Sequence, residues 1–166
     1  MKSDIITVRP IAHIKTDFPE KFGIPRQSLI VPELKGVIEF EQEFSDRAAV
    51  RGLEDFSHIW VIWGFSLSQS ERVSLTVFPP RLGGKVKKGV FATRSPYRPN
   101  GLGLSCVKLE EIAACEGEPL RLLVSGVDMA DGTPVYDIKP YMPYSDSLPE
   151  AEGGFGQEHK DDIIPV

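Results

Sequence analysis

Two arginines, a serine and an asparagine are concentrated within residues 94–101, RSPYRPNG. Pro96 and Pro99 each fix their own φ angle and favour extended geometry in the residue before them, so this segment is expected to be a stiff loop. A guanidinium group held on a stiff loop is suited to a planar anion such as a carboxylate or a phosphate. The segment therefore predicts an anion-binding loop, and the alternative is an ordinary polar hairpin.

Residues 81–98, called the cationic segment below, contain six cations and neither aspartate nor glutamate. The formal net charge of the whole chain is −5, which by itself argues against nucleic acid as a partner. A local block of cations can nevertheless neutralise several phosphates, and such contacts supply most of the non-specific affinity for nucleic acid. The segment therefore predicts an RNA contact, against the alternative of a solvated loop that binds nothing. The predicted RNA-binding residues are Arg81, Lys85, Lys87, Lys88 and Arg98.

Several common site signatures are absent from the sequence. Gly83-Gly84 lacks the spacing of a phosphate-binding P-loop, and residues 101–103 are too short for a dinucleotide fingerprint. Cys106 and Cys115 do not have the spacing of zinc ligands, so we expect reduced thiols in a cytoplasmic protein without a metal. The charged N-terminus does not predict a secretory signal, and no apolar run is long enough to span a membrane.

The elements that position these residues are expected to be mostly short strands. Apolar runs between turn residues predict strands in segments 5–14, 36–40, 57–67, 74–78, 89–93, 102–109, 120–127 and 135–140. Pro10 favours an edge position for the first strand. The strands 89–93 and 102–109 are expected to form a hairpin around the stiff loop. Trp60 and Trp63 are expected on opposite faces of their strand, where His58 is interpreted as a core histidine rather than a catalytic base.

A second hairpin is predicted around Asp131-Gly132, because this dipeptide between two apolar runs is a strong turn signal. Asp128, Asp131 and Asp137 would then gather at one hairpin end, unless they are only turn residues and solvated charges. A single helix is expected over residues 45–53, with Ser45 as N-cap and Gly52 at its end.

This pattern of many short strands, one short helix and no strand–helix alternation predicts a mainly β, single-domain protein, a partly closed barrel. Residues 1–148 are expected to form the barrel. Residues 149–166 are rich in proline, glycine and acids, and predict a flexible acidic tail.

Three long segments of the sequence are similar to one known family. Residues 51–63, 80–105 and 131–147 closely resemble, in this order, the TsaA-like family of tRNA methyltransferases, and the similarity extends over about residues 5–148. The resemblance implies a compact β-barrel that works as a homodimer with S-adenosylmethionine as cofactor. It also implies methylation of the exocyclic amine of threonylcarbamoyl-adenosine, beside the anticodon of a threonine tRNA. Longer members carry a further domain after the barrel.

The resemblance also implies which residues form the site. The cofactor-binding residues implied by matching motifs are Gln27, Ser28, Leu29, Phe65, Ser66, Arg94, Leu104, Val127 and Asp128. Arg94 suits the carboxylate of the cofactor, and Asp128 suits its ribose hydroxyls. Asp137 and Tyr141 are hypothesised to be catalytic, because a conjugated amine is a poor nucleophile and a nearby proton acceptor would help. Two alternatives remain open at this point: an RNA-binding module without chemistry, and a cofactor-binding regulator that leaves tRNA unmodified.

Overall fold

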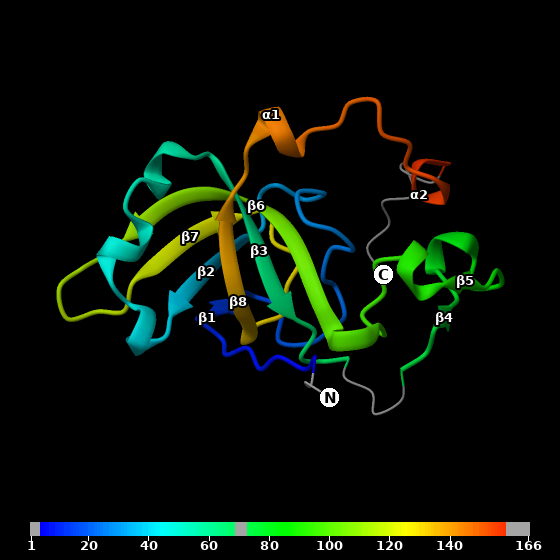
Figure 1. The fold of residues 1–166 in the computed structure, drawn as a ribbon, viewed down its shortest axis with the longest axis horizontal. Helices are drawn as coiled ribbons and strands as arrows, with labels where there is room; N and C mark the ends of the chain where they lie inside the picture. The colour runs from blue at the N-terminus through cyan, green and yellow to red at the C-terminus, as the bar shows by residue number, and fades with distance from the viewer. Residues whose placement is uncertain (1–3, 69–72, 159–166) are drawn as a thin grey trace.

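The protein folds as a closed antiparallel barrel with a small two-stranded sheet beside it (Figure 1). The computed structural model describes residues 4–68 and 73–158. The barrel strands are β1 (Ala12–Lys15), β2 (Lys35–Phe40), β3 (His58–Gly64), β6 (Leu102–Ala113), β7 (Arg121–Ser125) and β8 (Thr133–Pro140). They are arranged in the order β1-β2-β7-β6-β3-β8, with β1 also paired to β8. The predicted β-barrel class is confirmed, and the barrel is closed rather than partly closed.

The small sheet pairs β4 (Thr76–Val77) with β5 (Lys88–Gly89). Single turns of 3-10 helix connect the strands: η1 (Gln42–Phe44), η2 (Arg47–Val50), η3 (Leu53–Asp55), η4 (Pro80–Leu82), η5 (Val90–Ala92) and η6 (Pro99–Gly101). Two α-helical turns, α1 (Pro143–Asp146) and α2 (Phe155–Glu158), follow the barrel. No helix in this described part of the chain is long and apolar enough to cross a lipid bilayer.

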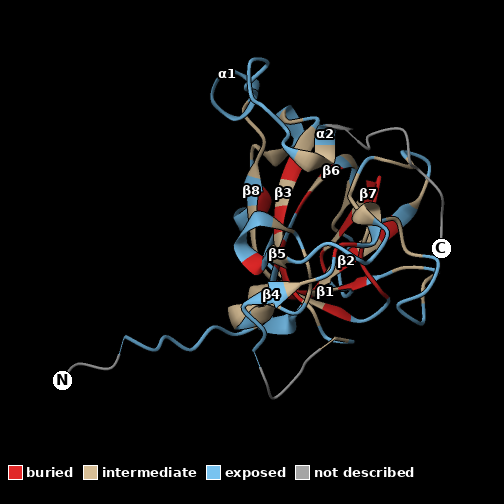
Figure 2. Ribbon diagram, turned by 90° about the vertical axis from the view of Figure 1, so that its right-hand side faces the viewer, coloured by how far each residue is buried: buried red, intermediate tan, exposed pale blue. Residues whose placement is uncertain are grey.

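Alternation of side chains along the strands builds the core, which Figure 2 shows as buried segments inside the barrel. The central strand β3 places Ile59, Val61 and Trp63 inside, whereas Trp60 is only partly buried on the outer face. The predicted division of the two tryptophans between opposite faces is therefore confirmed. Across the ladder, the three inward residues of β3 are paired with Val107, Ser105 and Gly103 of β6.

The first strand is not at an edge, contrary to the prediction for segment 5–14. Strand β1 begins only at Ala12 and is paired with β2 on one side and β8 on the other. Pro10 lies just before the strand, where its missing N–H removes no bond from the ladder. Barrel closure thus removes the edge that the proline was taken to indicate.

The helix predicted over residues 45–53 is also wrong. This segment forms the 3-10 turns η2 and η3, separated at Gly52, whose φ of 85° lies in the left-handed region. Asp46 caps η2 by accepting from the Ala48 N–H at 2.8 Å. Ser45, predicted as the cap, instead accepts a hydrogen bond at 2.7 Å from the backbone N–H of Leu120. Ser45 and Asp46 are therefore turn residues rather than the beginning of an α-helix, and their hydrogen bonds hold this loop against the barrel.

The hairpin predicted around residues 94–101 does not form. Lys88 of β5 pairs with Val77 of β4, and residues 90–92 turn into η5 instead of extending a strand. Val90 is fully buried and its N–H donates to the Leu75 carbonyl at 2.9 Å, which holds this turn against the small sheet. The loop 94–101 therefore connects the small sheet to β6, and strand 102–109 extends to Ala113.

The second predicted hairpin is wrong in its pairing, although a turn is present at Asp131-Gly132. Strand β7 lies between β2 and β6, and β8 lies between β1 and β3, so the two are not neighbours. The turn is instead fastened to the first strand: Asp131 accepts from the Thr16 N–H at 3.0 Å, and the Gly132 N–H donates to the Ile14 carbonyl at 2.8 Å. Segment 126–132 is thus a crossing connection at one end of the barrel.

The segment after the barrel contacts the small sheet. The Arg81 guanidinium donates to the carbonyl of Gly156 at 3.3 Å, and the Lys88 ammonium lies 5.8 Å from the centre of the Phe155 ring. Figure 1 shows α2 beside β4 and β5. Part of the predicted flexible tail therefore forms a helical turn, and its residues 159–166 lie outside the described residues.

We expect a substitution of Gly103 by alanine to destabilise the barrel. A Cβ at Gly103 would lie 2.3 Å from the indole of Trp63, so the ring would have to move. Such overpacking costs about 2 kcal/mol of unfolding free energy, measurable by chemical denaturation. Gly89→Ala is the matched control, because a Cβ at Gly89 has no heavy atom within 4 Å. Equal unfolding free energies for the two variants would contradict this account.

Candidate functional site

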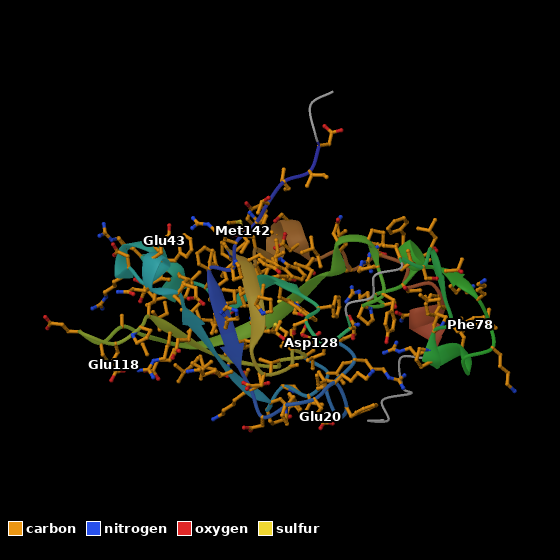
Figure 3. The ribbon with its side chains drawn as sticks, turned by 90° about the horizontal axis from the view of Figure 1, so that it is seen from below. Glu20, Glu43, Phe78, Glu118, Asp128 and Met142 are labelled. Carbon is orange, nitrogen blue, oxygen red and sulfur yellow. The ribbon has the colours of Figure 1, made fainter. Side chains whose placement is uncertain are left out.

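Several of the predicted site residues meet at the end of the barrel where β3 ends, β6 begins and segment 126–132 crosses. Figure 3 shows Asp128 between the barrel strands and the small sheet that carries Phe78, whereas Glu43 and Glu118 lie at the opposite end. The loop 27–29 and the stiff loop 94–101 reach the same place, as the contacts below establish. Four separate parts of the chain therefore contribute to one site.

Asp128 is held by two side chains that sequence reasoning did not identify. Its Oδ1 accepts a hydrogen bond from the Ser105 hydroxyl at 2.6 Å, and the Ser105 oxygen accepts in turn from the Trp63 indole N–H at 2.9 Å. Ser105 is 1% exposed and Trp63 is 6% exposed. The Trp63 ring meets the ring of Phe65 edge-on, with centroids 4.4 Å apart. This buried arrangement connects predicted residues Phe65 and Asp128 through the barrel wall.

The Asp128 carboxyl titrates close to neutral pH. Burial raises its pKa from 3.8 to about 6, because a charge is less well solvated inside the barrel mouth. The Ser105 hydroxyl, the Ser28 backbone N–H and the positive charge of Arg94 act in the opposite direction. Asp128 is therefore mostly ionised at pH 7 and has Ser28 and Arg94 as neighbours, which confirms that these three predicted residues are close together.

The loop 27–29 is fixed to this site by two contacts. The guanidinium of Arg94 donates to the side-chain oxygen of Gln27. Leu29 has a φ of 63°, which is costly for a side chain with a Cβ, and its N–H donates to the Gly126 carbonyl at 2.9 Å. A Cβ at Gly126 would lie 2.5 Å from Leu29 Cδ2, so only glycine fits under this leucine. The strained residue is therefore locked against the segment that carries Asp128, as is common at binding sites.

Other predicted cofactor residues lie around this centre in different environments. Val127 is 1% exposed and belongs to the core, so its side chain is a structural support. Ser66 is exposed just beyond β3. Leu104 is 58% exposed on the outer face of β6, the face opposite to Ser105. Within one chain, Leu104 is thus separated from Asp128 by the sheet itself.

The two predicted catalytic residues are not brought together. Asp137 pairs with Ile62 near the site end of β3, and its carboxylate lies 3.3 Å from the Lys139 ammonium. The register of β8 shifts beside Ile62. Tyr141 donates its backbone N–H to the carbonyl of His58 and its ring contacts Trp60, which places it at the beginning of β3. The length of β3, about 20 Å, therefore lies between Tyr141 and the centre at Asp128.

A cleft of about 250 Å³ opens beside the centre and was also missed by sequence reasoning. Its walls include Phe65, Tyr97, Arg98, Asn100 and Tyr136. The Arg98 guanidinium donates to the Thr93 carbonyl at 2.9 Å, so it braces the stiff loop as well as lining this cleft.

The remaining cations of the predicted RNA-binding set lie on the small sheet and its turns. Lys85 and Lys87 are exposed, whereas Arg81 and Lys88 are partly covered by the segment around α2. In the part of the chain that the structure describes, none of the cations in the cationic segment forms an ion pair with a carboxylate. The small sheet therefore presents positive charge beside the site.

The signal for the missed residues was present in the sequence but was not decisive. Ser105 is a polar residue at an inward position of an apolar strand, where an unbonded hydroxyl is costly. That position implies a partner, yet the identity of the partner depends on β3 lying next to β6. Trp63 was noted only as one of two tryptophans, one of which was expected in the core.

Comparison with known proteins decides the family. The family model described as the tRNA-methyltransferase O N-terminal domain matches residues 13–147. The chain belongs to this family. The predicted family resemblance is therefore confirmed, and the match spans nearly the whole described barrel.

Relatives of this family are similar over most of the chain. A tRNA (adenine(37)-N6)-methyltransferase of Escherichia coli is 43% identical over 147 residues, which are 89% of this chain and 62% of the relative. A Pseudomonas aeruginosa protein, whose name describes an S-adenosylmethionine-dependent methyltransferase, is 50% identical over 87% of this chain and 58% of its own length. A crystal structure of TrmO superposes with a TM-score of 0.74 at 42% identity, over 90% of this chain and 64% of that one. The chain thus spans about three fifths of the length of these relatives.

The residues at the site fit the cofactor that the resemblance implies. S-Adenosylmethionine has a carboxylate, a ribose with two hydroxyls and a positively charged sulfur. Arg94 is a donor suited to a carboxylate, and the Asp128 carboxylate is an acceptor suited to hydroxyls. Phe65 offers an aromatic face to a cation. The side chains present therefore match the groups of the cofactor in chemical type.

Asp128→Asn is expected to stabilise the protein at pH 8 and not at pH 4. The folded-state pKa of about 6 lies above the ordinary 3.8, so keeping Asp128 ionised disfavours the folded state above pH 6. Removing the charge should raise the unfolding free energy at pH 8 by the order of 1–2 kcal/mol, and the gain should disappear as the pH falls below 4. Thermal denaturation across this pH range is the measurement. A gain that did not depend on pH would show that ionisation of Asp128 is not its cause.

Proposed function

We propose that the protein is an S-adenosylmethionine-dependent tRNA methyltransferase that methylates the exocyclic amine of threonylcarbamoyl-adenosine beside the anticodon of threonine tRNA. The observation that carries this proposal is the 43% identity to a tRNA (adenine(37)-N6)-methyltransferase over 89% of the chain. The carboxylate of Asp128 and the guanidinium of Arg94, which lie close together beside cations that have no carboxylate partner among the described residues, give independent support. Such a site offers groups for a nucleoside cofactor and, next to them, charge for a phosphate backbone.

Each residue of the site is proposed to contact a different group of the cofactor. When bound, S-adenosylmethionine supplies a methyl group on a positively charged sulfur. Arg94 binds its carboxylate, Asp128 accepts from the ribose hydroxyls, and Phe65 contacts the cation. Because methyl transfer is an in-line displacement, most of the rate gain comes from holding the two reactants in line. The strained loop at Leu29 and the braced loop at Arg98 supply the rigidity that this requires.

A proton has to leave the amine that receives the methyl group. The bound cofactor would supply the methyl group, with the electron pair of the C–S bond remaining on sulfur, and an acceptor on the protein would take up the proton of the amine. Of the two residues predicted for this role, Asp137 has the better position, since it is half-exposed and pairs with Ile62 near the site end of β3, whereas Tyr141 lies at the other end. The cleft beside the centre would then hold the base that is modified, between aromatic walls.

The tRNA backbone is proposed to lie across the small sheet. Lys85 and Lys87 are exposed and without carboxylate partners among the described residues, so both are available to phosphates. Ion pairs elsewhere hold other lysines, for example Lys108 at 2.9 Å from Glu110. Lys15 and Lys139 of the barrel strands are likewise paired with carboxylates.

The working form is proposed to be a homodimer. Large apolar side chains are exposed on the outer face of β6 and beside the small sheet, and exposed groups of this kind mark interaction sites. They include Leu75 at 65%, Phe91 at 74%, Leu102 at 43% and Leu104 at 58%. Covering these side chains with a second copy would also give the outward-facing Leu104 a place in a site near the subunit interface.

Methyl transfer to tRNA tests the proposed activity. The protein should transfer label from methyl-labelled S-adenosylmethionine to threonine tRNA that carries threonylcarbamoyl-adenosine, and not to the same tRNA without this group.

Arg94→Ala should weaken cofactor binding about 10-fold to 100-fold, because it removes a charge-assisted hydrogen bond. Isothermal titration calorimetry measures this change. Arg51→Ala is the matched control, since Arg51 is exposed in the turns before β3. Cofactor binding without methyl transfer would instead favour the cofactor-binding regulator.

Charge removal on the small sheet should weaken tRNA binding without affecting the cofactor. The double substitution Lys85→Ala and Lys87→Ala is expected to reduce the slope of log affinity against log salt by about 2, because each lysine releases about one counterion. Filter binding across a range of salt concentrations measures the slope. Lys108→Ala is the control, since Lys108 is already paired with Glu110. An unchanged slope in the double variant would place the tRNA on another surface.

A further inference from the structure

We propose that Ser105 and Trp63 are positioning residues that fix the Asp128 carboxylate in the orientation needed to accept from the ribose hydroxyls of the methyl donor. This inference rests on the proposed function and assigns a role to two residues outside the predicted site. It depends on the direction of two hydrogen bonds and on the packing that holds their first donor in place.

The direction of the bonds follows from the chemistry of the three groups. The indole N–H of Trp63 is a donor only, so the Ser105 oxygen at 2.9 Å is its acceptor. A serine hydroxyl has one proton, and the Asp128 Oδ1 at 2.6 Å is its acceptor. Trp63 thereby orients the Ser105 hydroxyl, and the hydroxyl proton is committed to Asp128. The remaining lone pairs of the carboxylate are then left for other donors.

The indole that starts this series is held by its surroundings. Gly103 is opposite Trp63 in the β3–β6 ladder, and a Cβ there would lie 2.3 Å from the ring. The Phe65 ring contacts the same indole edge-on. Trp63 therefore occupies space that only glycine leaves open, and a side chain packed in this way keeps one rotamer. Its N–H has a fixed position from which it orients Ser105.

A serine at position 105 also requires an explanation in terms of function. The inward positions around Ser105 hold aliphatic residues such as Val61 of β3 and Val107 of β6, both fully buried. Burying a hydroxyl among them is unfavourable unless it is hydrogen-bonded, and an aliphatic residue would fill the same space. The hydroxyl has both bonds that its geometry needs, and both lead toward the site. The role of the Ser105 hydroxyl is therefore to hold the carboxylate of Asp128.

The ionisation of Asp128 gives this role a signature. The groups that act on its carboxyl are Ser105 from β6, the Ser28 N–H from the loop 27–29, the backbone N–H of Asp128 itself and the Arg94 guanidinium from the stiff loop. Each of them lowers the pKa against the larger effect of burial. Removing the Ser105 hydroxyl should therefore raise the pKa further above 6. Since a protonated carboxyl has lost acceptor capacity, cofactor affinity should fall at a higher pH than in the wild-type protein.

The experiment uses the full chain with Ser105→Ala, Ser105→Thr and Trp63→Phe. Carbon-13 NMR of the aspartate carboxyls in the cofactor-free protein follows the titration of Asp128, whose signal is assigned by its absence in Asp128→Asn. Calorimetry with S-adenosylmethionine from pH 5 to pH 9 gives the affinity. Thermal denaturation confirms that each variant is folded. Trp63→Phe keeps an aromatic ring and removes the N–H together with part of the indole, so, where thermal denaturation shows it to be folded, it tests the same series of bonds if Ser105→Ala does not fold.

We expect Ser105→Ala to raise the titration midpoint of Asp128 and to weaken cofactor binding at pH 7 by about 5-fold to 10-fold, the effect of one ordinary hydrogen bond. Ser105→Thr keeps the hydroxyl and should restore both properties, and Trp63→Phe should give an intermediate change. A folded Ser105→Ala protein with an unchanged midpoint or an unchanged affinity would overturn the proposal. Failure of the wild-type protein to bind S-adenosylmethionine at any pH would overturn the proposed function and the ribose contact. The carboxyl titration would then still test the order of the hydrogen bonds.

Discussion

The pairing of β3 with both β6 and β8 is the constraint on which the rest of the structure depends. Because β3 is paired with β6 along its whole length and with β8 from Ile59 to Trp63, alternation decides which of its side chains enter the barrel and which face outward. The inward set ends at Trp63, next to the glycine that leaves room for it. The next residue, Gly64, is covered by the Tyr136 ring on the other face. One strand end thus fixes both the buried support of Asp128 and a wall of the cleft.

The number and location of most strands could be predicted from the sequence, whereas their partners could not. Alternation and apolar runs identify segments such as 36–40 and 102–109, because burial on one face leaves a local pattern. The neighbours of a strand depend on contacts between residues far apart in the chain. Asp131-Gly132 was read as a hairpin for this reason, although its bonds go to the first strand. Ser45 and Asp46 were likewise correct as turn residues and wrong as the beginning of an α-helix.

In the candidate site, too, the motifs could be predicted from the sequence, whereas the contacts between distant residues could not. Gln27, Ser28, Arg94 and Asp128 were named through motif resemblance, and the contacts place them together. Tyr141 belongs to a motif that runs along β8, and a strand of this length carries the motif from one end of the barrel to the other, away from the centre. Ser105 and Trp63 were missed because their importance arises from a pairing between strands. Resemblance by segments therefore identifies which motifs meet, but not which side chains connect them.

The contact between Leu29 and Gly126 has a consequence for how sequences of this family can vary. Leu29 adopts a backbone conformation that suits a residue without a Cβ, and Gly126 has to lack a side chain to leave room for it. The two positions are therefore not free to change independently. A side chain at position 126 would be strained at a φ of 76° and would also force the end of the Leu29 side chain to move, so the two positions constrain each other even though they lie in distant parts of the chain.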